Sequence, residues 1–199
     1  MAYSFLLATG NAHKAHEFSE LFPGDVIEVT SAPEKVEVVE DGLTFSENAL
    51  KKARAYYQKF KKPVMADDSG LNVLALPDEL GIHTARFGGE GLTSKQRNEL
   101  LIERLKDKSE GERSATFVCV LCFYFSEEEV FFFEGRLGGS IASLETGAEG
   151  FGYDPVFIPE KVEGDESLAQ LSDWKQKNSH RALACQSALK FFKERVGQN

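Results

Sequence analysis

Some segments of this chain have the apolar pattern of a strand, and others have apolar residues at the spacing of a helix. The sequence therefore predicts a mixture of strands and helices. Runs of apolar residues predict strands at 4–8, 26–30, 63–66, 115–125, 130–137 and 140–144. Apolar residues at helical spacing predict a helix that ends before Pro23, and others at 44–60, 93–105 and 182–196. We therefore expect an α/β protein with a long, twisted, mixed sheet flanked by helices.

Two of these helices carry a start signal in the sequence. Thr44 precedes Glu47 by three residues, and Thr93 precedes Gln96 by the same spacing. A hydroxyl and a carboxylate or amide at this spacing satisfy the backbone N–H groups that a helix start leaves without partners. We therefore interpret Glu47 as a capping residue and not as a metal ligand.

Size and charge limit the classes of function. The chain has 199 residues, of which 42% are apolar, which suits one domain of roughly 100–200 residues with a sizeable core. The net charge is −9, and the acidic residues are spread along the chain. This balance argues against binding to nucleic acid or to a membrane surface. A small polyanionic ligand would need a local cluster of basic residues.

The sequence predicts a cytoplasmic protein. It has no apolar stretch near the roughly 20 residues that span a bilayer. Its first residues lack the basic flank of a signal peptide.

The cysteines fit the same compartment. Cys119 and Cys122 have the spacing of a metal-binding or redox pair, but they lie within a predicted strand. Residues three apart on a strand face opposite sides, so we expect buried, inert thiols.

Asp67 and Asp68 are the most informative candidates for chemistry. They follow the apolar run 63–66 and precede Ser69-Gly70, so we expect them at the end of a strand, with a sharp turn at Gly70. Paired carboxylates in this place can hold Mg²⁺ together with a phosphate. A turn in which an aspartate side chain caps the backbone is the alternative.

A second candidate lies between the first strand and the first helix. Thr9-Gly10-Asn11 and Lys14 stand where free backbone N–H groups and the helix dipole favour an anion. The segment lacks the second glycine and the Gly-Lys-Ser/Thr ending of a Walker A loop. An ordinary strand–helix turn explains it equally well.

Other candidates have plain structural alternatives. Lys52, on the second helix, would usually be exposed, and Glu40-Asp41-Gly42 reads also as a solvated turn. Phe151-Gly152-Tyr153-Asp154 and Lys175 could bind a purine base or form a core aromatic cluster. Ser179-His180-Arg181 could join that base site or cap the last helix.

Six motifs in order resemble the inosine triphosphate pyrophosphatase family. They are Thr9-Gly10-Asn11-x-x-Lys14, Glu40-Asp41-Gly42-x-Thr44-Phe45-x-Glu47-Asn48-Ala49, Ala66-Asp67-Asp68-Ser69-Gly70-Leu71, Thr84-Ala85-Arg86-Phe87, Gly150-Phe151-Gly152-Tyr153-Asp154-Pro155 and Ser179-His180-Arg181. The resemblance runs from residue 5 to about residue 190. It implies Mg²⁺-dependent hydrolysis of ITP, dITP and XTP to the nucleoside monophosphate and pyrophosphate.

The resemblance also implies a role for each candidate. The triphosphate would be held by Thr9, Gly10, Asn11, Lys14 and Lys52. The metal would be held by Glu40 and Asp68, with Asp67 beside them; Asp68 would also be the general base, and Ser69 would touch the substrate. The purine base would be bound by Phe151, Gly152, Tyr153, Asp154, Lys175, His180 and Arg181.

The implied architecture is a single domain over residues 1–199, elongated, with two lobes around a central cleft, that forms a homodimer. The phenylalanine-rich segment between 123 and 133 is a candidate contact surface, or else a buried hairpin. Two other functions stay open at this point: a related pyrophosphatase with a different nucleotide preference, and a nucleotide-binding regulator without turnover.

Overall fold

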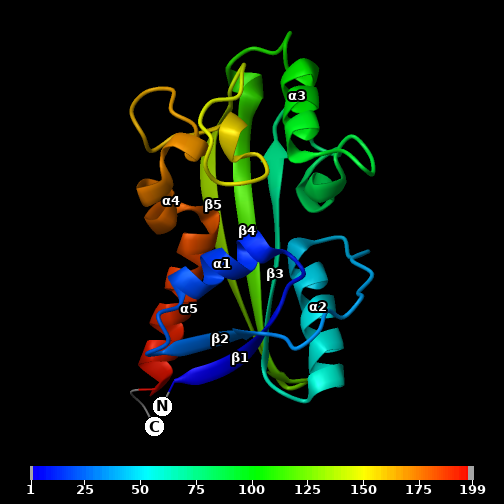
Figure 1. The fold of residues 1–199 in the computed structure, drawn as a ribbon, viewed down its shortest axis with the longest axis vertical. Helices are drawn as coiled ribbons and strands as arrows, with labels where there is room; N and C mark the ends of the chain where they lie inside the picture. Colours follow the sequence, from blue (N-terminus) through cyan, green and yellow to red (C-terminus); the bar gives the residue numbers. More distant parts are fainter. Residues whose placement is uncertain (1, 197–199) are drawn as a thin grey trace. The chain divides into compact units, whose positions relative to one another are not determined.

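The computed structural model describes residues 2–196 and contains a mixed sheet with helices on its faces (Figure 1). In chain order the elements of this part are β1 (Tyr3–Ala8), α1 (Ala12–Leu21), β2 (Ile27–Ser31), α2 (Phe45–Phe60), β3 (Val64–Val73), α3 (Ser94–Arg104), β4 (Ser114–Ser126), β5 (Glu129–Ile141), β6 (Phe157–Pro159), α4 (Ser172–Asn178) and α5 (His180–Val196). The strand order is β2-β1-β3-β4-β5-β6. The predicted α/β class is confirmed.

The sheet combines parallel and antiparallel pairs. β1 runs parallel to β2, with Tyr3 opposite Ile27, and parallel to β3, with Leu6 opposite Val64. β5 and β6 are antiparallel, with Gly139 opposite Pro159. Parallel neighbours need a crossover, and α1 and α2 supply the two crossovers among the first three strands.

The described chain divides into two compact units. Unit 1 comprises Met1–Ser69, Cys119–Gly135 and His180–Asn199, and unit 2 comprises Gly70–Val118 and Arg136–Ser179. The boundaries fall within β3, β4 and β5, so these three strands pass from one unit into the other.

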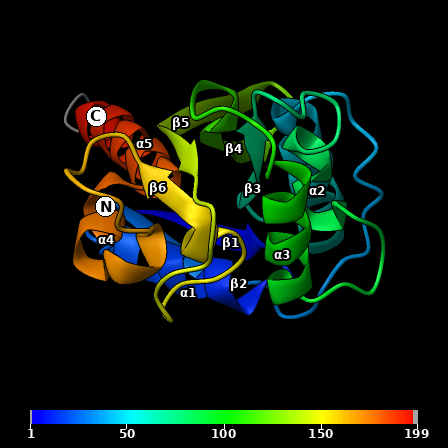
Figure 2. The ribbon, with the colours of Figure 1, turned by 90° about the horizontal axis from the view of Figure 1, so that it is seen from above.

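Strand alternation builds two apolar layers in unit 1, because neighbouring residues of a strand face opposite sides. One layer joins α1 and α5 to the sheet and includes Phe5, Leu7, Met65, Cys119, Leu121, Phe123 and Phe192. The other joins α2 to the sheet and includes Leu6, Ala8, Val64, Ala66, Cys122 and Tyr124. Figure 2 shows α1 and α5 on one side of the strands of unit 1 and α2 on the other.

The same alternation separates the cysteines. Cys119 belongs to the layer under α1 and α5, whereas Cys122 belongs to the layer under α2. Both thiols are free and buried, and burial raises the pKa of each to about 12. The prediction of buried thiols is confirmed, and the raised pKa values agree with the expected low reactivity. The phenylalanine-rich hairpin is largely packed, because Phe123, Phe125, Phe131 and Phe133 contact α5, and Phe132 is exposed.

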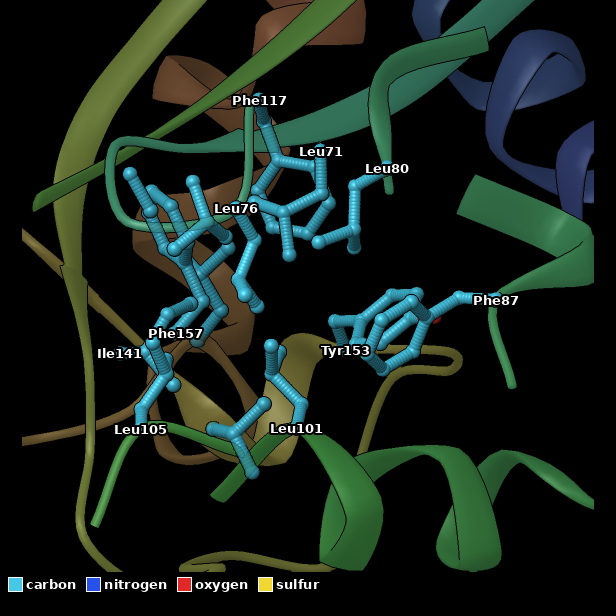
Figure 3. Packing of buried hydrophobic residues seen from close by; sticks show 14 of the residues in the cluster. Leu71, Leu76, Leu80, Phe87, Leu101, Leu105, Phe117, Ile141, Tyr153 and Phe157 are labelled. Carbon is cyan, nitrogen blue, oxygen red and sulfur yellow. The ribbon is translucent and has the colours of Figure 1, made fainter. Parts of the chain in front are cut away.

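Unit 2 has its own apolar core (Figure 3). Its buried side chains come from β3, α3, β4, β5 and the segment after residue 150, and include Leu71, Leu101, Leu105, Phe117, Ile141, Tyr153 and Phe157. Tyr153 is therefore a core residue, which agrees with the alternative that this segment forms a core aromatic cluster. Phe151 is half-buried and lies outside the cluster.

Two predicted strand ends were wrong. β3 does not stop at the acidic pair but continues to Val73, and Gly70 has no positive φ. Asp67 and Asp68 are buried within the strand, and each carboxylate accepts a hydrogen bond from a side chain of a neighbouring helix. The turn that was the alternative for the acidic pair is therefore also absent.

The predicted separate strand at 140–144 is the second error. β5 runs without interruption from Glu129 to Ile141 through Gly138 and Gly139. A Cβ atom on Gly139 would overlap the backbone of Ile158 in β6, so this glycine serves close strand approach and not a turn. β6 and α4 were not predicted.

In residues 2–196 no helix is long and apolar enough to cross a membrane.

Replacing Gly135 tests how α5 packs on β5. A Cβ atom there would overlap the carbonyl oxygen of His180 and the amide nitrogen of Ala184. Gly135→Ala is expected to lower the free energy of unfolding by about 1–3 kcal/mol, because backbone cannot move away cheaply. Denaturant titration measures this change.

Gly111→Ala is the matched control, since a Cβ atom at Gly111 meets nothing within 4 Å. It should change the free energy of unfolding by less than about 0.5 kcal/mol. Equal stabilities of the two variants would contradict the tight contact between α5 and β5.

Candidate functional site

The acidic pair points to both faces of the sheet in unit 1. The side chain of Asp67 faces the same side of the sheet as Met65, toward α1. Its Oδ2 atom accepts from Lys14 Nζ at 2.7 Å. The side chain of Asp68 faces the same side of the sheet as Ala66, toward α2. Its Oδ2 atom accepts from Asn48 Nδ2 at 3.1 Å. Because β3 continues through the pair, the two carboxylates have separate surroundings.

Asp67 is fully buried and held ionised. Burial opposes its charge, but Lys14, Lys52 and Arg181 outweigh burial and keep the pKa of the Asp67 carboxyl below its usual range. Its Oδ1 atom is buried and has no hydrogen-bond partner within the described residues. This carboxylate thus depends on ion pairing with the surrounding cations.

Asp68 behaves in the opposite way. Burial raises its pKa to about 6, although Lys52 and the hydrogen bond from Asn48 favour the charged form. The Asp68 Oδ1 atom also accepts from the backbone N–H of Ser69 at 3.0 Å. Two adjacent carboxyl groups with pKa values shifted apart are typical of acid–base sites.

Lys52 links the acidic pair to Glu40. Its Nζ atom donates to the carbonyl oxygen of Asp67 at 2.8 Å and lies 2.9 Å from Glu40 Oε2. Burial lowers the pKa of Lys52, but the charges of Asp67 and Glu40 outweigh burial and raise it. The structural alternative of an exposed Lys52 was wrong, since only 13% of this side chain is exposed.

Asn48 connects the start of α2 to the loop that carries Glu40. Its Oδ1 atom accepts from Gly42 N at 2.8 Å, while its Nδ2 atom donates to Asp68. Thr44 Oγ1 caps α2 by accepting from Glu47 N, and Glu47 Oε2 accepts from Leu43 N. The prediction that Glu47 is a cap is confirmed. Asn48 was not singled out from sequence, although it lies within the motif 40–49.

The turn between β1 and α1 is organised by its own polar side chains. Thr9 Oγ1 accepts from Asn11 N, and Asn11 Oδ1 accepts from the backbone N–H groups of His13 and Lys14. Asn11 is therefore the N-cap of α1. Gly10 has no Cβ atom to meet the Lys35 side chain, whose Cε would lie 3.0 Å away.

Arg181 joins three elements of unit 1 at the same place. Its Nη1 atom lies 2.8 Å from Glu17 Oε2 of α1, and its Nη2 atom donates to Ser69 Oγ of β3 at 3.2 Å. Arg181 and His180 are buried at the start of α5. Glu17 was not singled out from sequence, because no local pattern marks a helix carboxylate that pairs with a distant arginine.

Most of the residues predicted to bind a base form a second cluster within unit 2, whereas His180 and Arg181 belong to unit 1. Lys175 Nζ donates to Asp154 Oδ2 at 2.8 Å, and the same oxygen accepts from Phe151 N at 2.8 Å. Lys175 Nζ also lies 5.0 Å from the centre of the Phe151 ring. Asn98 Nδ2 of α3 donates to the carbonyl oxygen of Gly152 at 3.0 Å. Asn98 was missed from sequence, since it lies outside the motifs.

The predicted site residues thus fall into two groups. Unit 1 holds Thr9, Gly10, Asn11, Lys14, Glu40, Lys52, Asp67, Asp68, Ser69, His180 and Arg181; unit 2 holds Phe151, Gly152, Tyr153, Asp154 and Lys175. Their roles toward a substrate stay predictions.

The chemistry of the donors in unit 1 fits a hard cation. Glu40 and Asp68 both lie on the side of α2 and offer carboxylate oxygens, which Mg²⁺ prefers. Within residues 2–196 no three His, Cys, Asp or Glu side chains are grouped to hold a metal by themselves. Mg²⁺ typically takes one or two carboxylates plus waters and substrate phosphates, so this donor set is sufficient.

Comparison with known proteins gives consistent matches over nearly the whole chain. A model of the Ham1 family matches residues 5–191. The dITP/XTP pyrophosphatase of Malacoplasma penetrans is 37% identical over 200 residues, which covers 96% of this chain and 98% of that protein. The dITP/XTP pyrophosphatase of Aquifex aeolicus is 39% identical over 196 residues, which covers 94% of this chain and 96% of that protein.

Solved structures agree with these matches. The Ham1 protein of Staphylococcus aureus superposes with a TM-score of 0.84 at 36% identity and covers 96% of this chain and 99% of its own. A HAM1 protein from Coxiella burnetii superposes with a TM-score of 0.83 at 31% identity over the same shares.

The raised pKa of Asp68 predicts a pH-dependent cost to folding in the metal-free protein. Between about pH 4 and 6 the folded state binds more protons at Asp68 than the unfolded state, so the stability from this group is lost as pH rises. Asp68→Asn is expected to raise the free energy of unfolding by about 1–3 kcal/mol at pH 7.5 and by less at pH 4. Denaturant titrations with a chelator at both pH values measure this.

Asp107→Asn is the control, because Asp107 is an exposed carboxylate. It should leave the stability difference between the two pH values unchanged. If Asp68→Asn destabilised the protein at pH 7.5, the burial cost assigned to Asp68 would be wrong.

Proposed function

Because this chain belongs to the Ham1 family, we propose that it hydrolyses non-standard purine nucleoside triphosphates to the nucleoside monophosphate and pyrophosphate. The proposed substrates are ITP, dITP and XTP. The proposal draws on relatives named dITP/XTP pyrophosphatase that match almost their full lengths. The resemblance seen in the six motifs points in the same direction.

One structural observation carries the proposal: the acidic pair of β3 is surrounded by cations from three helices. Lys14 comes from α1, Lys52 from α2 and Arg181 from α5. A triphosphate carries about four negative charges, and a chain of net charge −9 would repel it without such a local cluster. Each lysine ammonium has three N–H donors, so Lys14 and Lys52 would keep their present partners and also donate to phosphate oxygens.

We propose that Mg²⁺ is held by Glu40 and Asp68, with Asp67 beside them. When bound, the ion would neutralise phosphate charge and polarise the phosphoryl group under attack. Asp67, which stays ionised beside Lys14, would hold that lysine in place. Asn48 would orient the Asp68 carboxylate through its bond to Oδ2.

Asp68 is the proposed general base. Burial raises the pKa of this carboxyl to about 6 in the metal-free protein, and bound Mg²⁺ would lower it, so that the ionised carboxylate would be able to accept a proton from water. The proton of the attacking water would move to Asp68, and the bond between the α- and β-phosphates would break. Positioning and charge neutralisation would supply most of the rate, as in other phosphoryl transfers.

The base would be selected by donors. Hypoxanthine and xanthine present an oxygen acceptor at position 6, whereas adenine presents an amino donor. Lys175 is a side chain that only donates, so adenine would leave a buried donor unpaired at a cost of roughly 1–3 kcal/mol. The half-buried ring of Phe151 would stack on the purine.

The homodimer and the cytoplasmic location expected from the sequence stay predictions. Size-exclusion chromatography with light scattering measures the first of them directly.

A nucleotide panel tests the proposed reaction. Pyrophosphate release from ITP, dITP and XTP is expected to have a kcat/KM at least about ten-fold above that for ATP and dUTP. EDTA should stop the release and Mg²⁺ should restore it. Orthophosphate as the sole product would rule the reaction out, and a preference for dUTP would indicate a related enzyme with a different nucleotide preference.

Asp68→Asn tests the base. The variant cannot accept the proton of water, so we expect its kcat for ITP to fall by about 10²-fold or more, while its circular dichroism stays that of the wild type. Asp107→Asn should keep wild-type kinetics. An active Asp68→Asn variant would overturn the assignment. A loss of activity caused by unfolding would be seen as a changed circular dichroism spectrum.

A further inference from the structure

The segment 150–154 contains two glycines and is held by three hydrogen bonds, one within the segment and two to other residues of unit 2. Gly150 and Gly152, on either side of Phe151, both have positive φ. Asp154 Oδ2 accepts from Phe151 N, and Asn98 Nδ2 donates to the carbonyl oxygen of Gly152. The hydroxyl of Tyr153 donates to the carbonyl oxygen of Thr84 at 2.9 Å. The backbone on both sides of Phe151 is therefore held by side chains.

The anchor of Tyr153 is itself fixed to β3. Thr84 Oγ1 accepts from Leu71 N at 2.9 Å and donates to the carbonyl oxygen of Gly81. The Tyr153 ring lies in the apolar core of unit 2 (Figure 3). Asn98 holds the backbone nearer to Phe151, at the peptide between Gly152 and Tyr153.

Asn98 is an unusual residue for its position on α3. It is 2% exposed and shares the buried side of the helix with Leu101. Its Oδ1 atom is buried without a hydrogen-bond partner in the described residues. A buried amide with one of its two ends unsatisfied stabilises folding less than an apolar side chain of similar size. Proteins depart from the rule that buried polar groups are fully hydrogen-bonded mainly where a residue serves function.

We propose that Asn98 is a positioning residue for the purine base, acting through the carbonyl of Gly152 on the ring of Phe151. The inference rests on the proposed function, in which that ring stacks on the base. A glycine at positive φ leaves its peptide planes easy to rotate. The bond from Asn98 removes that freedom before substrate arrives, so less ordering is needed on binding.

Asn98→Leu separates this role from a structural one. The midpoint of denaturant unfolding should be equal to or above that of the wild type, because an unsatisfied amide has been removed. The KM for ITP should rise about three- to ten-fold, the range of one lost hydrogen bond, with kcat changed less than about two-fold. A purely structural Asn98 would instead lower the midpoint.

Thr93→Ala is the matched control on the same helix. Thr93 and Gln96 form the capping box of α3 by hydrogen bonds to each other. This variant should lower the unfolding midpoint and leave the KM for ITP within about two-fold of the wild type. A shared rise in KM would mean that helix stability, and not the bond to Gly152, matters.

A double-mutant cycle tests the route through Phe151. In a Phe151→Ala background there is no ring to position, so adding Asn98→Leu should change the KM for ITP by less than about two-fold. The same rise in both backgrounds would overturn the route. Hydrogen exchange of residues 150–153 should become faster in Asn98→Leu and stay unchanged in Thr93→Ala.

The outcomes separate the two proposals. A wild-type protein that releases no pyrophosphate from ITP would overturn the proposed function, and the positioning role with it. An active wild type together with an Asn98→Leu variant of unchanged KM would overturn the positioning role alone.

Discussion

The burial of a charged carboxylate in the middle of a strand is the constraint on which unit 1 depends. Asp67 has no exposed surface, and an unpaired charge in such a place costs several kcal/mol. Lys14, Lys52 and Arg181 offset that cost, and they come from helices on both faces of the sheet. One buried charge thereby ties the packing of three helices to a single point on β3. Stability and the cation cluster of the candidate site are consequences of the same contacts.

Continuity of β3 explains why two neighbouring aspartates differ. Side chains alternate along a strand, so Asp67 meets the side of α1 and Asp68 the side of α2. The first is surrounded by positive charge and the second mainly by protein that excludes water. A turn at this place would have exposed both groups to solvent and made them alike. The strand is thus part of the chemistry.

The sequence predicted the element types well and the ends of strands less well. Capping residues and apolar spacing are local signals, so α2 and α3 begin where Thr44 and Thr93 indicate. The end of β3 depends on Lys14 and Asn48, which lie far away in the chain. For the same reason Asn48 and Asn98 escaped notice. Site residues inside motifs were found through the resemblance, whereas residues that support them need the fold.

The cysteine arrangement has a consequence for chemical durability. Oxidants attack thiolates that they can reach, and Cys119, Cys122 and Cys185 lie covered in the layers on either side of the sheet of unit 1. At neutral pH these sulfurs stay protonated, because burial raises the pKa of Cys119 and Cys122 to about 12 and the pKa of Cys185 well above its usual range. Peroxide and similar reagents therefore find no ready cysteine target in the folded protein. Conditions that damage nucleotides would leave these sulfurs intact.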